Sequence, residues 1–220
     1  HTPGAGTFTA TFTASNTPGA GTATATTVVT ATATATELPG VELLSNTAFD
    51  LVDSNGDPDL TPWTVANSTG DKIKCNKVGK PVVALSGECA FRFKGSIGET
   101  GSLSQLANTS ARAVLEAGDT LTLSFFVNAE VAPVAKAKLR VKYSDGTDKG
   151  KLTLELTTAT IGYILLSDAY SVTSSAVQSV KVKFDNRSTS SKFYLDDVSL
   201  RLIEGIAPTS TSAPRLNSQG

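Results

Sequence analysis

The sequence predicts an all-β protein, an antiparallel jelly-roll-like β-sandwich with an extended Thr/Ala-rich N-terminal strand or tail. Apolar and polar residues alternate along short stretches such as Val180-Lys-Val182-Lys-Phe184, which places one side of a strand in a core and the other in water. Asp, Gly and Asn turns such as Ser144-Asp-Gly146-Thr147 separate these stretches, and no stretch keeps a helical period. Many short strands at this spacing are typical of a double-sheet jelly roll.

Composition divides the chain into three parts: a tail over 1–40, a sandwich domain over 41–205, and a Ser/Thr/Pro-rich tail over 206–220. The clearest strands are expected within the sandwich at Val82–Leu85, Cys89–Phe93, Thr120–Val127, Ala137–Tyr143, Lys151–Leu156, Ile161–Leu166, Val177–Phe184 and Lys192–Ile203.

The overall balance of charge is nearly neutral. Apolar residues make up 40% of the chain and charged ones 18%, so the middle can bury a core. A net charge of −1 gives no electrostatic reason to expect nucleic acid or an anionic membrane as partner. No apolar run approaches the roughly 18 residues that span a bilayer. Because the chain begins at His1 and contains no Met, we expect a mature, extracellular or cell-surface protein.

Two cysteines, Cys75 and Cys89, flank a segment that contains Pro and Gly. In an exported protein they would form a disulfide worth about 3 kcal/mol, and in a cytosolic one they would be two free buried thiols. Three Asn-x-Ser/Thr triplets, at Asn67, Asn108 and Asn186, predict glycosylation at an extracellular surface.

The N-terminal tail contains an internal repeat. Thr2-Pro3-Gly4-Ala5-Gly6-Thr7 returns at 17–22, and each copy precedes an alternating run. The second run lasts fifteen residues, with Thr at every even position from 22 to 36 except Val28. On a strand this pattern gives one hydroxyl side and one small apolar side.

Two interpretations of the tail stay open. It is either an O-glycosylated linker that is too poor in large side chains to fold, or a strand that pairs with another sheet. In the second case the tail would bind a neighbouring copy head to tail and build a filament, or it would fold back on its own sandwich. The partner-binding residues would be Phe8, Phe12, Ala23, Ala25, Val29, Ala31, Ala33 and Ala35.

Five landmarks in residues 42–203 together resemble the carbohydrate-binding-module jelly rolls of the 4/9/22 type; the tail is not part of the match. They are Leu44-Ser-Asn46-Thr-Ala-Phe49-Asp50, Pro62-Trp63-Thr64, Gly101-Ser-Leu-Ser104-Gln105, the run from Leu115 to Phe125, and Phe193-Tyr-Leu195-Asp196-Asp197-Val198-Ser199-Leu200. The last is the most specific. The resemblance implies a sandwich whose Trp63 packs at the core edge, and a structural Ca²⁺ held by Asp50 and Asp197.

A second candidate calcium site comes from the residues themselves. Asp53, Asn55, Asp57 and Asp59 place oxygen side chains at alternate positions of a turning segment, which suits a hard cation. Position 64 is Thr64 and not the bidentate Glu of an EF-hand, so the alternative is a plain turn between strands. Any Ca²⁺ here would be structural, and no other cofactor is expected.

No catalytic residues are predicted, so we expect a protein that is not an enzyme. A single His supports neither a Ser-His or Cys-His pair nor a copper site. The resemblance implies sugar binding, for which Tyr143, Tyr163 and Tyr170 are the candidate stacking platforms, although each also fits a half-buried aromatic.

These observations predict a structural subunit of an extracellular filament that polymerises with copies of itself by strand addition of the tail. The alternative is a carbohydrate-binding module of a secreted polysaccharide-active protein, with glycans as partners and the tail as a glycosylated linker.

Overall fold

The computed structural model describes residues 40–108 and 115–204. The predicted partner-binding residues of the tail, from Phe8 to Ala35, and the C-terminal tail lie outside this part of the chain. Within it there is no helix, and hence none that could serve as a membrane span.

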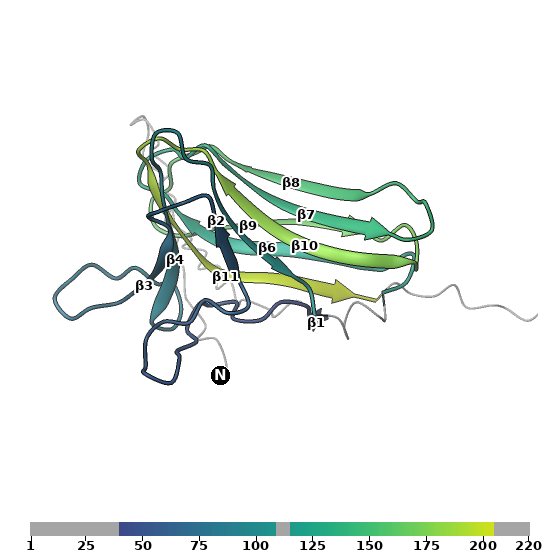
Figure 1. Ribbon diagram of the computed structural model, residues 1–220, viewed down its shortest axis with the longest axis horizontal. Helices are drawn as coiled ribbons and strands as arrows, with labels where there is room; N and C mark the ends of the chain where they lie inside the picture. The colour runs from purple at the N-terminus through teal and green to yellow at the C-terminus, as the bar shows by residue number, and fades with distance from the viewer. Residues whose placement is uncertain (1–39, 109–114, 205–220) are drawn as a thin grey trace, which may run out of the picture. The chain divides into compact units, whose positions relative to one another are not determined.

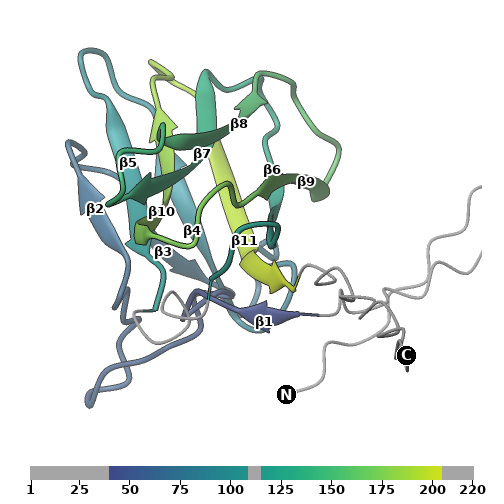
Figure 2. The same ribbon diagram turned by 90° about the vertical axis from the view of Figure 1, so that its right-hand side faces the viewer.

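The described residues form two antiparallel sheets, which confirms the predicted fold class. The strands are β1 (Val41–Glu42), β2 (Thr64–Ala66), β3 (Lys72–Cys75), β4 (Cys89–Lys94), β5 (Gly101–Leu106), β6 (Thr120–Asn128), β7 (Ala135–Tyr143), β8 (Gly150–Leu156), β9 (Ile164–Ser171), β10 (Val177–Asn186) and β11 (Lys192–Ile203). The six-stranded sheet has the order β3-β4-β11-β6-β9, with β1 also paired to β11, and the five-stranded sheet has the order β2-β5-β10-β7-β8. The two sheets face one another (Figure 1), and Figure 2 shows the same layers turned by 90°.

Alternation along each strand explains why the sheets pack together. On β10, Val180, Val182 and Phe184 are almost fully buried, while the residues between them point outward. On β7 the same parity buries Ala137, Leu139 and Val141, and three lysines and an arginine take the outward positions.

Aromatic rings fill the space between the sheets. Phe184 contributes from the five-stranded sheet and meets Phe125 of the other sheet edge-on, with ring centroids 5.0 Å apart. Trp63 is 5% exposed and donates from Nε1 to the carbonyl of Asn46, at 3.0 Å. Its place at the edge of the core agrees with what the resemblance implied.

Two predicted strands differ from the structure. Residues 82–85 form a loop and not a strand, because side-chain acceptors replace a partner strand: Asn76 Oδ1 accepts from the Val83 amide and Asp196 Oδ2 from the Leu85 amide. The strand expected at Ile161–Leu166 begins at Ile164, since Gly162 takes a positive φ of 74° in a turn.

Strands β1, β2, β3 and β5 were missed. The first three have two to four residues, too few to show a period. The inward side of β5 shows no apolar pattern in the sequence because one of its buried residues is the polar Gln105. The side-chain amide of Gln105 donates to the carbonyl of Ser45 and accepts from the Ser45 amide.

The predicted disulfide is confirmed. Cys75 and Cys89 lie directly opposite one another on β3 and β4 and are bonded, 14 residues apart in sequence. The bond closes the loop 76–88 at its base, on the six-stranded sheet.

Candidate functional site

Seven cations occupy the outward side of the five-stranded sheet. This surface, called the cationic face below, consists of Lys136, Lys138, Arg140 and Lys142 on β7, Lys151 on β8, and Lys181 and Lys183 on β10. The three strands are neighbours in the order β10-β7-β8, so alternate residues of each point to the same side.

The register sets like charges opposite one another. Lys181 faces Arg140, Lys183 faces Lys138, and Arg140 in turn faces Lys151 across the next pair of strands. Directly opposed residues have Cβ atoms about 5 Å apart, and like charges at that spacing destabilise a sheet. The chain therefore concentrates positive charge here at a cost in stability.

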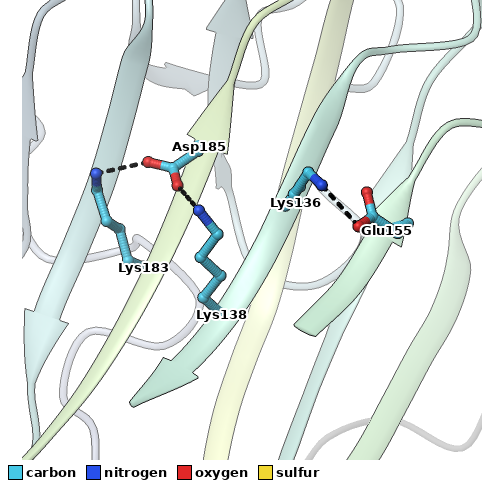
Figure 3. A network of polar contacts seen from close by, with 5 residues as sticks. All are labelled: Lys136, Lys138, Glu155, Lys183 and Asp185. Carbon is cyan, nitrogen blue, oxygen red and sulfur yellow. Dashed lines mark hydrogen bonds and ion pairs between the residues drawn. The ribbon is translucent and has the colours of Figure 1, made fainter. Parts of the chain in front are cut away.

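Carboxylates neutralise one half of the cationic face. Asp185 bonds Lys138 at 2.5 Å and Lys183 at 2.6 Å, while Glu155 bonds Lys136 at 2.8 Å. Figure 3 shows the two groups, with Asp185 between Lys183 and Lys138, and Glu155 beside Lys136. Burial raises the pKa of Asp185, but the two ammonium groups outweigh it and hold that pKa below its ordinary value.

The other half has no such partners. Within residues 40–108 and 115–204, no carboxylate lies within ion-pair distance of Arg140, Lys142, Lys151 or Lys181. We call these four residues the open cation cluster. Arg140, Lys142 and Lys151 are exposed and Lys181 is half-buried.

A groove of about 430 Å³ lies on the outward side of the six-stranded sheet, at its β3-β4-β11 end. Three strands supply its floor: Tyr194 on β11 lies opposite Arg92 on β4 and Asn128 on β6. The loop 77–83 forms one wall, together with Lys74, and Glu130 completes the polar lining. The size falls within the range of small-ligand sites.

The wall of the groove is fixed to the sheet. The Tyr163 hydroxyl donates to the carbonyl of Val83, Asn76 holds the Val83 amide, and the disulfide secures the base of the loop. On the floor, Arg92 donates from Nη2 to the carbonyl of Gly70, at 3.0 Å, while its buried Nε has no partner among the described residues. The lining of the groove thus includes a tyrosine, an arginine, an amide and a carboxylate.

Sequence reasoning missed the floor of this groove. The signal was present, because Tyr194 stands between the buried Phe193 and Leu195, and Arg92 between the buried Phe91 and Phe93. Alternation therefore points both residues outward. What the sequence did not show is that β4, β11 and β6 are neighbours.

Of the three tyrosines predicted as sugar platforms, Tyr143 is buried, whereas Tyr163 and Tyr170 are half-buried, which fits the half-buried aromatic that the sequence left open for each. Tyr143 is 8% exposed and belongs to the core. Tyr170 packs against that core, with its hydroxyl 3.0 Å from that of Tyr143 and its ring against Gly150. Tyr163 is half-buried with its hydroxyl bonded to the backbone, and desolvation raises its pKa.

The acidic segment 53–59 forms a turn on its own backbone. Asp53 Oδ1 accepts from the amides of Asn55 and Asp57, at 2.8 and 3.0 Å, which lowers the pKa of Asp53. Asp59 Oδ1 accepts from the Thr61 amide. These bonds match the plain turn that the sequence left open as the alternative to a calcium loop.

Three other carboxylates converge on the loop 85–89. Asp50 accepts from the amides of Glu88 and Cys89, Asp196 from those of Leu85 and Ser86, and Asp197 from the Ser86 hydroxyl. Burial, followed by the charge of Asp197, raises the pKa of Asp196 to about 7, and burial also raises that of Asp197.

The described residues contain no group of three or more His, Cys, Asp or Glu side chains arranged to hold a metal ion. Asp50 and Asp197 both reach the loop 85–89, yet each already has protein donors. The Ca²⁺ remains a prediction, and a melting temperature unchanged by a chelator would exclude a stabilising ion.

The predicted glycosylation sites fall into two groups. Asn67 and Asn108 are exposed, and their glycosylation stays a prediction. Asn186 is 3% exposed and its side-chain oxygen accepts from the Ser188 amide, so the folded chain does not offer it to a glycosylating enzyme. That prediction is corrected.

Comparisons with known proteins support the fold. The structure is similar to TmCBM61 solved with β-1,4-galactotriose, with 19% identity, a TM-score of 0.50, and coverage of 74% of this chain and 99% of that one. It is also similar to a cyclase from Fischerella sp. TAU, with 13% identity, a TM-score of 0.51, and coverage of 76% and 100%. A third likeness is to the enzymatically active domain of bacteriophage CBA120 tailspike protein 4, with 14% identity, a TM-score of 0.52, and coverage of 74% and 21%.

No protein-family model matches the sequence, and no curated protein matches it. The resemblance to carbohydrate-binding-module jelly rolls is confirmed at the level of the fold. Because similar folds also occur in a cyclase and in part of an enzymatically active tailspike domain, the fold by itself does not decide between binding and catalysis.

Proposed function

We propose that this protein is an extracellular, non-catalytic carbohydrate-binding module, and that the groove on the six-stranded sheet holds the glycan. The observation that carries the proposal is the groove floor, where Tyr194 stands on the strand between those of Arg92 and Asn128 and all three residues line the groove. The fold likeness to a module solved with a galactotriose supports a glycan as the ligand.

The chemistry of the lining suits a sugar. A tyrosine ring offers an apolar face to the C–H groups of a pyranose, and its hydroxyl remains available as donor or acceptor. Arg92 and Lys74 donate hydrogen bonds, Glu130 accepts them and Asn128 does both, so together they complement hydroxyl groups. A few placed polar groups around an apolar contact are typical of small-ligand sites.

The test is affinity gel electrophoresis of the full chain in gels containing β-1,4-galactan, xylan or mixed-linkage β-glucan. We expect retardation in at least one gel, lost in Tyr194→Ala and kept in the matched variant Tyr170→Phe, which changes a tyrosine outside the groove. Unretarded wild type in every neutral gel, or a Tyr194→Ala variant that is retarded as strongly as wild type, contradicts the proposal.

A filament subunit remains the second candidate, and the edge strand β9 favours it. Among the described strands, β9 pairs only with β6, and its sequence from Ile164 to Ser171 contains a single charge, at Asp168. Ile164 and Leu165 are 40% and 55% exposed. Edge strands are usually protected by charge or by short length, as β3 and β8 are here with two charged residues each.

In this second reading the alternating tail of one copy adds to β9 of the next. Negative-stain electron microscopy of the full chain tests it, beside a variant that lacks residues 1–37. Filaments that vanish in the shortened chain and in Leu165→Lys support strand addition at β9. Uniform single particles of the full chain at high concentration exclude it.

A further inference from the structure

The open cation cluster places several positive charges close together on one surface. Of its four residues, Lys181, Arg140 and Lys151 stand in one row across three neighbouring strands. Neighbouring strands lie about 4.8 Å apart, so the row places three positive charges along roughly 10 Å. Lys142 lies on the same side of β7, two residues and about 7 Å beyond Arg140.

The two halves of the cationic face differ in their counter-charges. The half at Lys136, Lys138 and Lys183 has Asp185 and Glu155 built into the sheet. Acidic residues therefore do occur on the cationic face, but within the described residues none of them forms an ion pair with the open cation cluster. An unneutralised row costs free energy in the free protein, and a bound polyanion would relieve that cost.

We propose that the open cation cluster binds an anionic polysaccharide, with carboxylate or sulfate groups of successive sugars on Arg140, Lys151 and Lys181. The proposal rests on the proposed function for the nature of the polymer, but it uses a different sheet from the groove. Arg140 can engage an oxyanion with two parallel N–H groups, whereas the lysines act as point charges.

A glycan fits this surface better than a nucleic acid does. No aromatic side chain lies among the outward residues of β7, β8 and β10, so the bases of a single-stranded nucleic acid would find no ring on which to stack. The whole chain has a pI of about 5.9, whereas nucleic-acid-binding domains are typically strongly basic.

The experiment compares dextran with dextran sulfate, which share a backbone and differ in charge, by biolayer interferometry of the immobilised full chain. We expect binding of dextran sulfate that weakens steeply with salt, and no comparable binding of dextran. The variant Arg140→Gln/Lys151→Gln/Lys181→Gln should lose roughly tenfold in affinity for dextran sulfate. The matched variant Lys74→Gln/Lys77→Gln/Lys80→Gln removes three charges from the groove and should change that affinity much less.

Three outcomes overturn the inference: equal binding of dextran and dextran sulfate, a larger loss in the groove variant than in the cluster variant, or equally tight binding of duplex DNA or phosphatidylserine vesicles. Retardation in the neutral gels tests the groove proposal and not the open cation cluster. If wild type is retarded there and shows no preference for dextran sulfate, the proposed function stands and this inference fails. A preference for dextran sulfate that survives Tyr194→Ala, without any neutral binding, contradicts the groove proposal and leaves the cluster intact.

Discussion

The outward sides of the two sheets differ although one core lies beneath both. The cationic face is carried by strands in register, and its charges follow directly from alternation along β7 and β10. The groove depends on a long loop, a disulfide and side chains from several strands. The comparison indicates that packing of the core determines which side chains point outward, whereas the loops determine whether those side chains line a groove.

Phe184→Ala should have the largest effect, because its ring contacts Phe125 and Trp63 and links the two sheets. We expect a loss of about 3–5 kcal/mol in the free energy of unfolding, measured by urea denaturation, with glycan binding lost on both sides. The control Leu106→Ala, on the outward side of β5, should stay within about 0.5 kcal/mol. A near-neutral Phe184→Ala would contradict a shared core.

Stability should fall as pH rises from about 4 to about 7. The pKa of Asp196 is raised to about 7 in the folded chain from an ordinary value of 3.8, mainly by burial. In this window the folded chain keeps a proton that the unfolded chain has released, so ionisation costs the folded state, by on the order of 4 kcal/mol at most.

Urea unfolding at pH 5 and pH 8, with chelator present, checks this pH dependence. The variant Asp196→Asn cannot ionise and should show a clearly smaller difference between the two pH values. The control Asp57→Asn, in an exposed turn, should keep the wild-type difference. If the free energy of unfolding differs between pH 5 and pH 8 by the same amount in wild type and in Asp196→Asn, the explanation is wrong.

Removing the disulfide should weaken glycan binding in the groove and leave binding at the open cation cluster nearly unchanged. Cys75→Ser/Cys89→Ser should lose about 3 kcal/mol of stability, because the loop 76–88 is no longer tied at its base. Neutral-glycan retardation should weaken with the wall of the groove, whereas affinity for dextran sulfate should stay within about twofold at a temperature where the variant is folded. Parallel losses of both would show that the two surfaces are not independent.

Glu155→Gln should have the smallest effect on stability. Its ion pair with Lys136 is exposed, so the change should cost under about 1 kcal/mol. It also frees a positive charge beside the open cation cluster, and affinity for dextran sulfate at low salt should rise. Lower affinity after this change would argue against charge as the basis of binding.

Much of the sandwich could be predicted from sequence, because β7 alternates over all nine of its residues, and long parts of β10 (180–184) and β11 (198–203) do the same. The outward lysines of β7 and β10 follow from the same pattern. That Lys181, Arg140 and Lys151 share one row could not be predicted, because register depends on pairing between distant strands. A net charge of −1 for the whole chain likewise does not indicate that seven cations gather on one side of a sheet.

The candidate groove was beyond sequence reasoning for a different reason. Its loop holds its shape through long-range bonds, such as those from Leu85 to Asp196 and from Tyr163 to Val83, which leave no local pattern. The misplaced strand at 82–85 comes from the same cause. The contact between Tyr143 and Tyr170, which lie on strands of different sheets, likewise leaves no local pattern in the sequence.

Backbone NMR of the full chain, titrated with an oligosaccharide cut from the best-bound neutral polysaccharide, tests the central claim most directly. We predict saturable shifts of the amide signals at Lys74, Arg92 and Tyr194, with the signals of β7 and β8 unmoved. The absence of saturable shifts, or shifts that are confined to another part of the chain, would contradict glycan binding in the groove.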